Sequence, residues 1–439
     1  MKNKKIFILL TMLLAFQILL SGCGIRQDQA VRTDIEYVSM WQENEPGGLW
    51  WKEMADKYEK QTGIHVTITF AGRDILTKIK SRMIMNDPPD LIDQSLDSMI
   101  ASYLYNGNIS LMPLDDFMEY EKGPEGQDKM MDIFNKDILE LFKVDGKNYF
   151  VPYELMANGF FYNKSLFEQY NLMPPKTLTD FFRLNDYLKA VEIAPLALDG
   201  TITNYTAYYY VWACMRIIGP GSFIKAAKDI SGTTWDEPGY RKAAEIAYEL
   251  GKNGKNYFQE GYEGSTWPIA QADWAMGKSG SILCGSWIPV ETSKQASEDM
   301  IYGFYPFPLV EGGEGKLTDV MISAIGCAIP KESKNFEMTK AFIKFVLKKE
   351  NAHKFSTDTI AISTRNDLDY PAVLSDIKPY ITNGRDFVLI MDGCARELPE
   401  WLYNVFVPLD NELLFGRIKP DNFIKQLKIK TVEYWNSKK

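Results

Sequence analysis

Hydrophobic positions along the chain follow two periods, one typical of strands and one typical of helices. Apolar and polar residues alternate over 64–70, which predicts a strand with one buried face. Just before it, residues 50–58 place apolar side chains at steps of three and four, which predicts an amphipathic helix. A strand at 35–41 precedes this pair, and a helix at 74–85 and a strand at 91–93 follow it. Strands that alternate with helices in this way indicate an α/β fold.

The same alternation continues through the rest of the chain, without an internal repeat or a long linker. Strands are predicted at 149–151, 159–162, 280–284, 303–306 and 322–329, and helices at 205–218, 240–253, 337–348 and 423–434. The chain has 439 residues, more than the roughly 250 to 300 residues that one hydrophobic core usually serves. We therefore expect at least two domains that interleave closely.

The N-terminus joins positive charge to a short apolar segment. Three lysines precede the apolar run 6–20, which is shorter than the roughly 18 to 20 residues of a membrane-spanning helix and indicates a secretory signal. The run ends in Leu20-Ser21-Gly22-Cys23, which resembles a bacterial lipobox. That resemblance implies that 1–22 is a signal peptide, that Cys23 carries a lipid anchor, and that 23–33 is a polar tether. An ordinary signal peptide with a coincidental cysteine is the alternative.

Charge and cysteine content narrow the classes of function. Without residues 1–22, which hold three lysines and no acids, the net charge falls from −9 to −12, which argues against nucleic acid as a partner. Four further cysteines lie far apart and lack the C-x-x-C spacing of a metal or redox pair: Cys214, Cys284, Cys327 and Cys394. We expect buried free thiols, with disulfides as the alternative. With only two histidines, no metal site and no cofactor are predicted.

Seven short segments of the chain together resemble one known family. They are FAGR (70–73), DPPDL (87–91), DGKNYFVP (145–152), FYNKSLF (161–167), PPKT (174–177), GSW (285–287) and GCAIPK (326–331). Their order and spacing are similar to those of the extracellular solute-binding proteins of carbohydrate ABC importers, the maltose-binding type of the periplasmic-binding-protein fold. The resemblance implies an α/β fold of type II, with a ligand cleft between two lobes joined by crossing hinge segments. It places the first lobe at 34–152 plus 302–358 and the second at 153–301 plus 359–439.

The resemblance also implies a function and its partners. We expect a monomer, anchored on the extracellular face of the membrane, that closes around a carbohydrate, an oligosaccharide in particular, and passes it to the permease subunits of an ABC importer. Two alternatives stay open: a binding protein for another solute or for a membrane sensor, and a surface glycoside hydrolase, whose cleft also joins aromatics to carboxylates. The sequence contains no nucleophile elbow, zinc motif or phosphate loop that would favour an enzyme.

Position along the predicted strands selects a first group of candidate ligand-binding residues. Polar and aromatic side chains at the carboxyl ends of strands face the crevice of an open α/β sheet, and hinge residues lie at a cleft. The group comprises Trp41, Glu43 and Asn44 after the first strand, Arg73 after the second, and Tyr153 and Glu154 at the hinge crossing. For Arg73 the alternative is a solvated surface charge.

Aromatic side chains form the second group, because a pyranose packs its C–H face on a ring while its hydroxyls need polar partners. The family resemblance selects Trp287, at the place of a stacking tryptophan, Tyr209 and Trp212 from a helix of the second lobe, and Trp401 at the start of a late helix. Arg396 and Glu397, just before that helix, are added because they could bond hydroxyls. Trp235 and Trp267 are added because they lie in predicted loops. For each aromatic the alternative is a place in the hydrophobic core. The sequence does not distinguish mono-, oligo- and uronic sugars as ligands.

Overall fold

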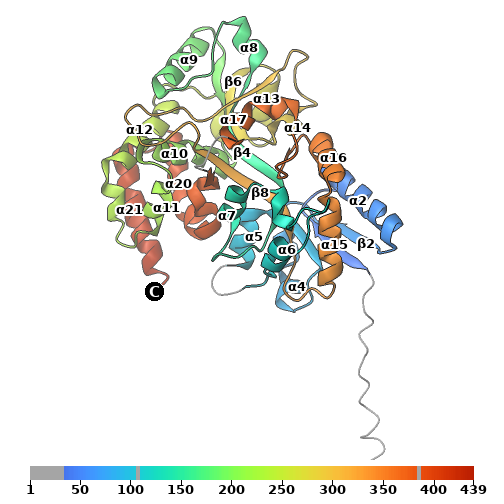
Figure 1. Cartoon of the computed structure of the whole chain (residues 1–439). Helices are drawn as coiled ribbons and strands as arrows, with labels where there is room; N and C mark the ends of the chain where they lie inside the picture. Colours follow the sequence, from blue (N-terminus) through green and yellow to red (C-terminus); the bar gives the residue numbers. More distant parts are fainter. Residues whose placement is uncertain (1–33, 105–108, 383–386) are drawn as a thin grey trace, which may run out of the picture.

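The computed structural model describes residues 34–104, 109–382 and 387–439 (Figure 1). The predicted signal peptide 1–22, the lipidation site Cys23 and the tether 23–33 lie outside these residues. Within the part that is described, no helix is long and apolar enough to cross a bilayer.

The described strands form one ten-stranded sheet that runs through both halves of the molecule. Its main path is β2 (Val66–Phe70), β1 (Ile35–Ser39), β3 (Leu91–Ser95), β8 (Val320–Ala328), β4 (Val151–Asn163), β6 (Ser279–Gly285) and β5 (Ala194–Ala197). Off this path, β10 (Phe387–Leu389) pairs with β8, and β7 (Tyr302–Tyr305) and β9 (Ile362–Ser363) pair with β4. The pairs β1–β2, β1–β3 and β5–β6 are parallel, whereas β3–β8, β8–β4 and β4–β6 are antiparallel. Two parallel α/β units are thus joined through an antiparallel centre.

Strand β4 links the two halves. Residues 151–158 pair with β8, and residues 158–162 pair with β6. Figure 1 shows β4 and β8 side by side at the centre, between the helices of the two halves. The sequence predicted strands at 149–151 and 159–162 with a hinge passage between them. The structure makes the passage one continuous strand, because β8 and β9 supply hydrogen-bond partners to its middle.

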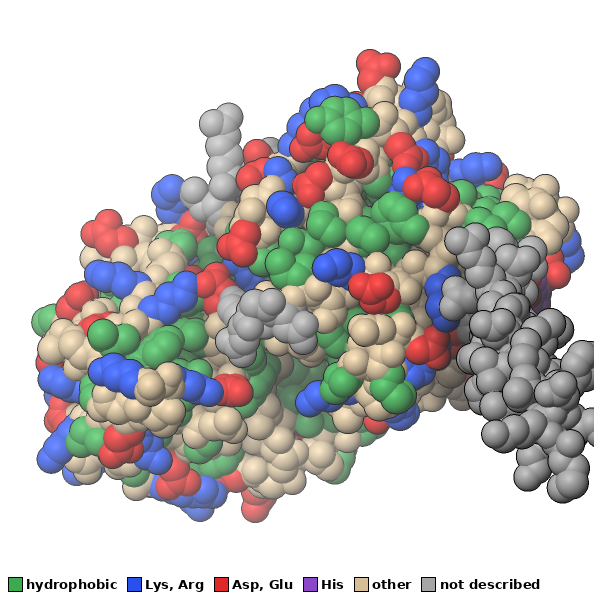
Figure 2. Space-filling model, turned by 90° about the horizontal axis from the view of Figure 1, so that it is seen from below, with side chains coloured by type: hydrophobic (Ala, Val, Ile, Leu, Met, Phe, Trp, Pro, Cys, Tyr) green, Lys and Arg blue, Asp and Glu red, His purple; other side chains and the backbone are tan. Residues whose placement is uncertain are grey.

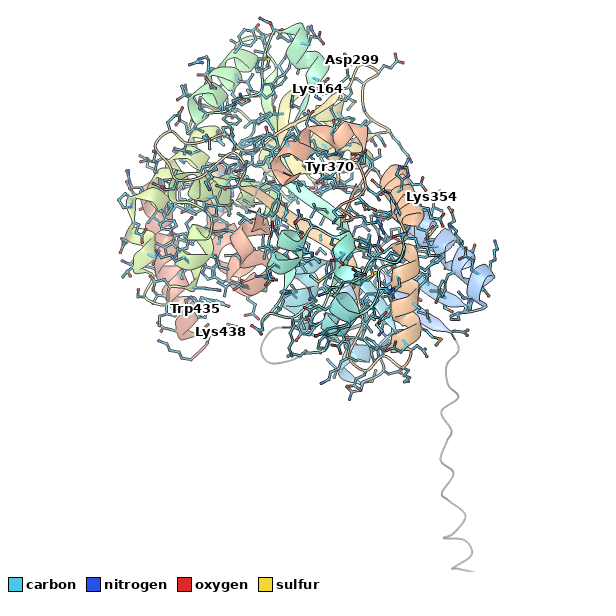
Figure 3. The ribbon with its side chains drawn as sticks, in the orientation of Figure 1. Lys164, Asp299, Lys354, Tyr370, Trp435 and Lys438 are labelled. Carbon is cyan, nitrogen blue, oxygen red and sulfur yellow. The ribbon has the colours of Figure 1, made fainter. Side chains whose placement is uncertain are left out.

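Helices cover the first lobe with their apolar faces inward. They are α2 (Pro46–Thr62), α3 (Ile75–Lys78), α4 (Lys80–Ile84), α5 (Leu96–Tyr103), α6 (Asp115–Tyr120), α7 (Lys136–Phe142), α15 (Phe336–Val346) and α16 (Lys349–Thr359). In α2, Trp50 and Tyr58 belong to the buried face, and Gly63 ends the helix with a φ of 75° that favours glycine. Lys354 of α16 pairs with Glu53 of α2 at 3.3 Å, which ties these two helices together (Figure 3).

Among the described residues, the second lobe contains more helices than the first. Its helices are α8 (Lys164–Gln169), α9 (Leu178–Ala190), α10 (Thr203–Ile218), α11 (Ser222–Lys228), α12 (Pro238–Leu250), α13 (Ile269–Ala275), α14 (Ile288–Thr292), α17 (Lys378–Thr382), α18 (Cys394–Glu397), α19 (Pro399–Trp401), α20 (Val407–Leu414) and α21 (Pro420–Asn436). Helix α10 lies in the middle, packed against α12 and α20, and all its residues from Tyr205 to Arg216 are buried. Near the C-terminus, the indole of Trp435 donates to the carbonyl of Ala227 at 2.9 Å and joins α21 to α11 (Figure 3).

The two-lobed α/β architecture that the sequence predicted is confirmed. The exact lobe boundaries stay a prediction. Strand β7 pairs with residues 160–163 of β4, which also belong to the part paired with β6. This pairing favours placing Tyr302–Tyr305 in the second lobe, rather than in the first lobe where the predicted boundary put it.

The four cysteines Cys214, Cys284, Cys327 and Cys394 are free and buried, which confirms the preferred interpretation of their spacing. Burial raises the pKa of each thiol, so the reactive thiolate is disfavoured at ordinary pH. Across the described ranges, no group of three or more His, Cys, Asp or Glu side chains is arranged to hold a metal ion.

Candidate functional site

One face of the β4–β8 pair carries polar side chains at the boundary between the lobes. Glu154 and Met156 are two residues apart on β4, and Ser323 of β8 is the register partner of Met156. Because side chains alternate along a strand, these three residues project from the same face of the pair. We refer to Glu154, Met156 and Ser323 as the floor of the site.

The first lobe contributes an aromatic ring and a cation. The guanidinium of Arg73 lies over the ring of Trp41, 4.8 Å from its centroid, and its Nη1 donates to Glu45 Oε2 at 2.9 Å. The same nitrogen donates to the carbonyl of Met40 at 2.8 Å. Beneath them, the Trp41 indole donates to the hydroxyl of Tyr153 at 2.9 Å. Trp41 is only 9% exposed, so it supports Arg73 rather than offering an open stacking surface.

The second lobe contributes aromatic rings beside an acid. Trp287 follows β6 and is half-buried, and its ring lies where a Cβ atom on Gly285 would approach it to 1.9 Å. Glycine is therefore required at that position. Glu291 is four residues beyond Trp287, one turn along the chain, and its Oε2 accepts the indole N–H of Trp267 at 3.3 Å. The Trp287 side chain also hydrogen-bonds to the hydroxyl of Tyr205.

Two observations bring these groups to the same region. The backbone N–H of Ser286 donates to the carbonyl of Ala157 at 2.9 Å, which holds the turn before Trp287 against β4. The positive charge of Arg73 acts on both Glu154 and Glu291 and opposes the effect of burial on their pKa values. The first-lobe cation thus lies within electrostatic reach of the floor and of the second lobe.

A second polar group lies further along the floor. The hydroxyl of Ser323 donates to Asp97 Oδ2 at 2.7 Å, at the start of α5 in the first lobe. Burial raises the pKa values of Tyr208 and Tyr403 of the second lobe, and the negative charge of Asp97 adds to this effect. Tyr403 also hydrogen-bonds to Asn204. Tyr403 is 40% exposed. The site therefore extends along the floor, from Arg73 at one end to Asp97 at the other, with residues of both lobes beside it.

Buried carboxylates distinguish this region from an ordinary polar surface. Burial raises the pKa of Glu154 to about 7 and that of Asp97 to about 6, and it also raises the pKa of Glu291. Glu154 Oε2 and Asp97 Oδ1 have no hydrogen-bond partner among the described residues. A buried, unpaired carboxylate oxygen is destabilising unless a donor reaches it. Both atoms are thus suited to accept hydrogen bonds from a ligand.

Four aromatic candidates lie in the core of the second lobe, so the structure contradicts their assignment to a cleft. Tyr209 packs on Phe160 and Phe258, and Trp212 donates to Asn158 Oδ1 at 2.7 Å. Trp235 and Trp401 stack on each other with centroids 6.0 Å apart, and Trp401 also donates to Thr431 at 3.1 Å. Each of the four is at most 1% exposed. Burial of a large aromatic ring stabilises a hydrophobic core strongly. The neighbouring residues in the sequence do not show whether such a ring lies in the core or in a cleft.

Four polar candidates lie away from the floor, and three of them engage other partners. Glu43 pairs with Lys52 at 2.7 Å on the open surface, and Asn44 is exposed beside it. Arg396 donates to the carbonyl of Leu141 at 3.1 Å and to Glu397 Oε1 at 3.0 Å, and Glu397 also pairs with Lys228. Arg396 and Glu397 thus tie α18 of the second lobe to α7 of the first, beside the site.

The remaining candidates, Trp41, Arg73, Tyr153, Glu154, Trp267 and Trp287, come together around the floor. Sequence reasoning missed Glu45, Asp97, Tyr205, Glu291 and Tyr403. Glu291 was within reach, since it lies four residues after Trp287 and so shares a face of the same helical turn. Glu45 was passed over for Glu43 and Asn44 in the same loop. Asp97 comes two residues after β3, so the rule that selected Arg73 after β2 could also have selected it. Tyr205 and Tyr403 carry no signal, because tertiary structure alone brings them to the floor.

The sequence of residues 42–353 matches the family described as bacterial extracellular solute-binding protein. The chain belongs to this family. The matched residues include the floor, Arg73 and the Trp287–Glu291 turn, so the site of this solute-binding protein lies within the part that defines the family. The resemblance carried by the seven short segments is confirmed at the level of the family.

Two relatives and one solved structure each match most of the chain. A multiple sugar-binding protein of Streptococcus mutans is 24% identical over 341 residues, 75% of this chain and 75% of that protein. The melibiose/raffinose/stachyose-binding protein MelE of Bacillus subtilis is 22% identical over 425 residues, 93% of this chain and 92% of that protein. A solved structure from work on xylan utilization by Caldanaerobius polysaccharolyticus superposes with a TM-score of 0.74 at 19% identity, covering 90% of this chain and 99% of that one. The superposition confirms the periplasmic-binding-protein type of fold.

Proposed function

We propose that this solute-binding protein captures a carbohydrate, an oligosaccharide in particular, between its lobes and passes it to the permease subunits of an ABC importer. The observation that carries the proposal is the Trp287–Glu291 turn held against β4 within electrostatic reach of Arg73. A half-buried indole offers a surface for the C–H face of a sugar, and the carboxylate beside it accepts hydroxyl hydrogen bonds. The names of the two relatives support a sugar as the ligand.

Capture follows from contacts that belong to different lobes. Arg73 and Asp97 come from the first lobe, and Trp287 and Tyr403 from the second. A ligand that contacts both sets stabilises the arrangement in which the lobes approach each other, because an open arrangement leaves one set without partners. Strand β4 is the shared element about which such a movement would occur.

The setting of the protein is part of the same proposal. We infer that Cys23 carries a lipid that holds a monomer on the extracellular face of the membrane, and the lipobox-like segment 20–23 supports this. We further infer that the protein binds its ligand without chemical change. Release of shortened products from any oligosaccharide incubated with the protein would contradict that inference.

The first test is thermal unfolding of residues 24–439 with a panel of mono- and oligosaccharides. A ligand at about 100 times its Kd adds roughly 2.7 kcal/mol to the free energy of unfolding, seen as a rise of a few degrees in Tm. Trp287→Ala is expected to abolish the rise. The matched control is Tyr120→Ala, which removes an aromatic ring that is 76% exposed on α6 and should keep the rise. A rise with amino acids or peptides, and with no sugar, would replace the carbohydrate by another solute.

A further inference from the structure

The charges at the boundary between the lobes are unbalanced. Its two cations each have an acidic partner already: Arg73 pairs with Glu45 at 2.9 Å, and Arg396 pairs with Glu397 at 3.0 Å. No ion pair within the described residues engages Asp97, Glu154 or Glu291. Three carboxyl groups therefore face the ligand region without a cation in direct contact.

Two of these carboxyl groups have an oxygen that awaits a donor. Asp97 is 5% exposed and Glu154 is 6% exposed, and Asp97 Oδ1 and Glu154 Oε2 have no hydrogen-bond partner among the residues described. Glu154 belongs to the floor, and Asp97 is bonded to the floor through Ser323 at 2.7 Å. A hydroxyl or an ammonium group of a ligand satisfies such an oxygen. A carboxylate, sulfate or phosphate of a ligand brings only further acceptors and adds like-charge repulsion.

The second-lobe side of the region offers the same kind of partner. Glu291 accepts hydrogen bonds from Trp267, at 3.3 Å, and from Gln271, and the cation that acts on it, Arg73, is paired with Glu45. Gln271 Nε2 donates to the hydroxyl of Tyr205 at 3.0 Å, and the indole of Trp287 donates to the same hydroxyl, so these two donors are already engaged. Nη1 of Arg73 is engaged by Glu45 and by the carbonyl of Met40, and the carboxylate of Glu45 offsets the positive charge of the side chain.

We propose that the site accepts uncharged or amine-bearing sugars and excludes anionic ones, so that uronic, sulfated and phosphorylated sugars are not ligands. This proposal rests on the proposed function and narrows it, since the sequence alone left uronic sugars open. Asp97, Glu154 and Glu291 are the residues that set the selectivity, by accepting donors from the ligand and by repelling anions at both ends of the floor.

The experiment compares matched sugars on the intact mature chain by isothermal titration calorimetry at pH 8. The probes are a neutral oligosaccharide found by the thermal panel, the same sugar with one primary hydroxyl oxidised to a carboxylate, and the same sugar with that hydroxyl replaced by an amine. The oxidised sugar is expected to bind at least about 100-fold more weakly than the neutral one, and the amine at least as tightly as the neutral one. The isosteric variants Glu154→Gln, Glu291→Gln and Asp97→Asn should each reduce the difference between neutral and oxidised sugars.

The control variant is Glu350→Gln, which removes an exposed carboxylate of the first lobe and should leave the ratio of the two Kd values unchanged. An oxidised sugar that binds the wild type as tightly as the neutral sugar overturns the proposal and leaves the carbohydrate function intact. Absence of binding by every sugar overturns both. The wild-type ratio decides the matter even where a variant fails to fold, and circular dichroism identifies such a variant.

Discussion

Glu154 is a buried carboxyl group with one oxygen that lacks a hydrogen-bond donor among the described residues. Its carboxyl group lies on the central strand, 6% exposed, where burial raises its pKa to about 7. Only the distant charge of Arg73 opposes that effect. Among the described residues the ionised form has no donor for Oε2, so a hydroxyl group of a ligand that reached this oxygen would stabilise it.

The raised pKa of Glu154 makes stability depend on pH. The folded state binds a proton more tightly than the unfolded state, so its contribution to stability is present at low pH and is lost as the pH rises toward about 7. Glu154→Gln removes that loss, and we expect the variant to be more stable than the wild type at pH 8 by up to roughly 3 kcal/mol, with little difference at pH 4. Urea unfolding at both pH values measures this.

Asp97 and Asp392 shift in the same direction, each to a pKa of about 6 mainly through burial, so the wild type and the variant both keep part of the slope. The variant Glu337→Gln, at an exposed position, serves as the control and should retain the full slope. Equal stability of wild type and Glu154→Gln at pH 8 would show that Glu154 is not destabilised by burial in the empty protein.

Helix α10 shows at the scale of an element where reasoning from sequence stops. Its run of tyrosines and its tryptophan predicted a helix, and the structure has one from Thr203 to Ile218. Because α10 is enclosed by α12, α20 and the sheet, apolar residues occur on all its sides, and periodicity cannot show which face meets the ligand. Tyr205 therefore lies at the site, while Tyr209 and Trp212 lie in the core.

The elements that could be predicted either have one buried face that leaves its period in the sequence, as β2 and α2 have, or are apolar strands buried throughout, as β8 is. Strands β5, β9 and β10 and many helices, α16 among them, were not predicted. The helix expected at 74–85 is instead the two short helices α3 and α4. The side chains around the floor were found where strand ends mark them, as for Arg73, and missed where only the tertiary fold brings them in, as for Tyr403.

Two substitutions on α10 should separate stability from ligand binding. Trp212→Ala removes a stacked ring and leaves Asn158 Oδ1 without its donor, and we expect it to lower the free energy of unfolding by about 3 to 5 kcal/mol while the folded protein keeps its Kd for the ligand. Tyr205→Phe should lower stability by only about 1 kcal/mol and weaken ligand binding, since Trp287 and Gln271 lose a partner. Urea unfolding and calorimetric titration measure the two effects. A higher Kd for the ligand in Trp212→Ala, with no increase in Tyr205→Phe, would mean that Trp212 belongs to the ligand-binding site.

At the scale of the whole molecule, one sheet joins the two lobes, and the face in Figure 2 carries charges of both signs. The face in Figure 2 shows Lys and Arg side chains interspersed with Asp and Glu, without a broad area of one sign. On this face, no broad area of one sign adds to the unpaired carboxyl groups at the lobe boundary.

The location of the whole molecule depends on its N-terminus. Cys23→Ser removes the thiol that the proposed lipid requires, and we expect the protein to move from the membrane fraction of its host to the medium or to the soluble exported fraction. Mass spectrometry of the wild type should find the lipid on Cys23. Cys214→Ser, at a buried thiol, is the control and should stay with the membrane. Retention of Cys23→Ser on the membrane would mean that another contact holds the protein there.

Because β4 belongs to both lobes and the chain returns through β8, neither lobe is encoded by one uninterrupted stretch of gene. Exchange of a contiguous gene segment between relatives would therefore break a lobe in most cases instead of transplanting a binding surface. Point substitutions in the short loops that follow β1, β2 and β6 leave the shared strand intact. Substitutions in these loops can therefore change the first-lobe and second-lobe contacts to a ligand one at a time, while the strands that join the lobes stay as they are.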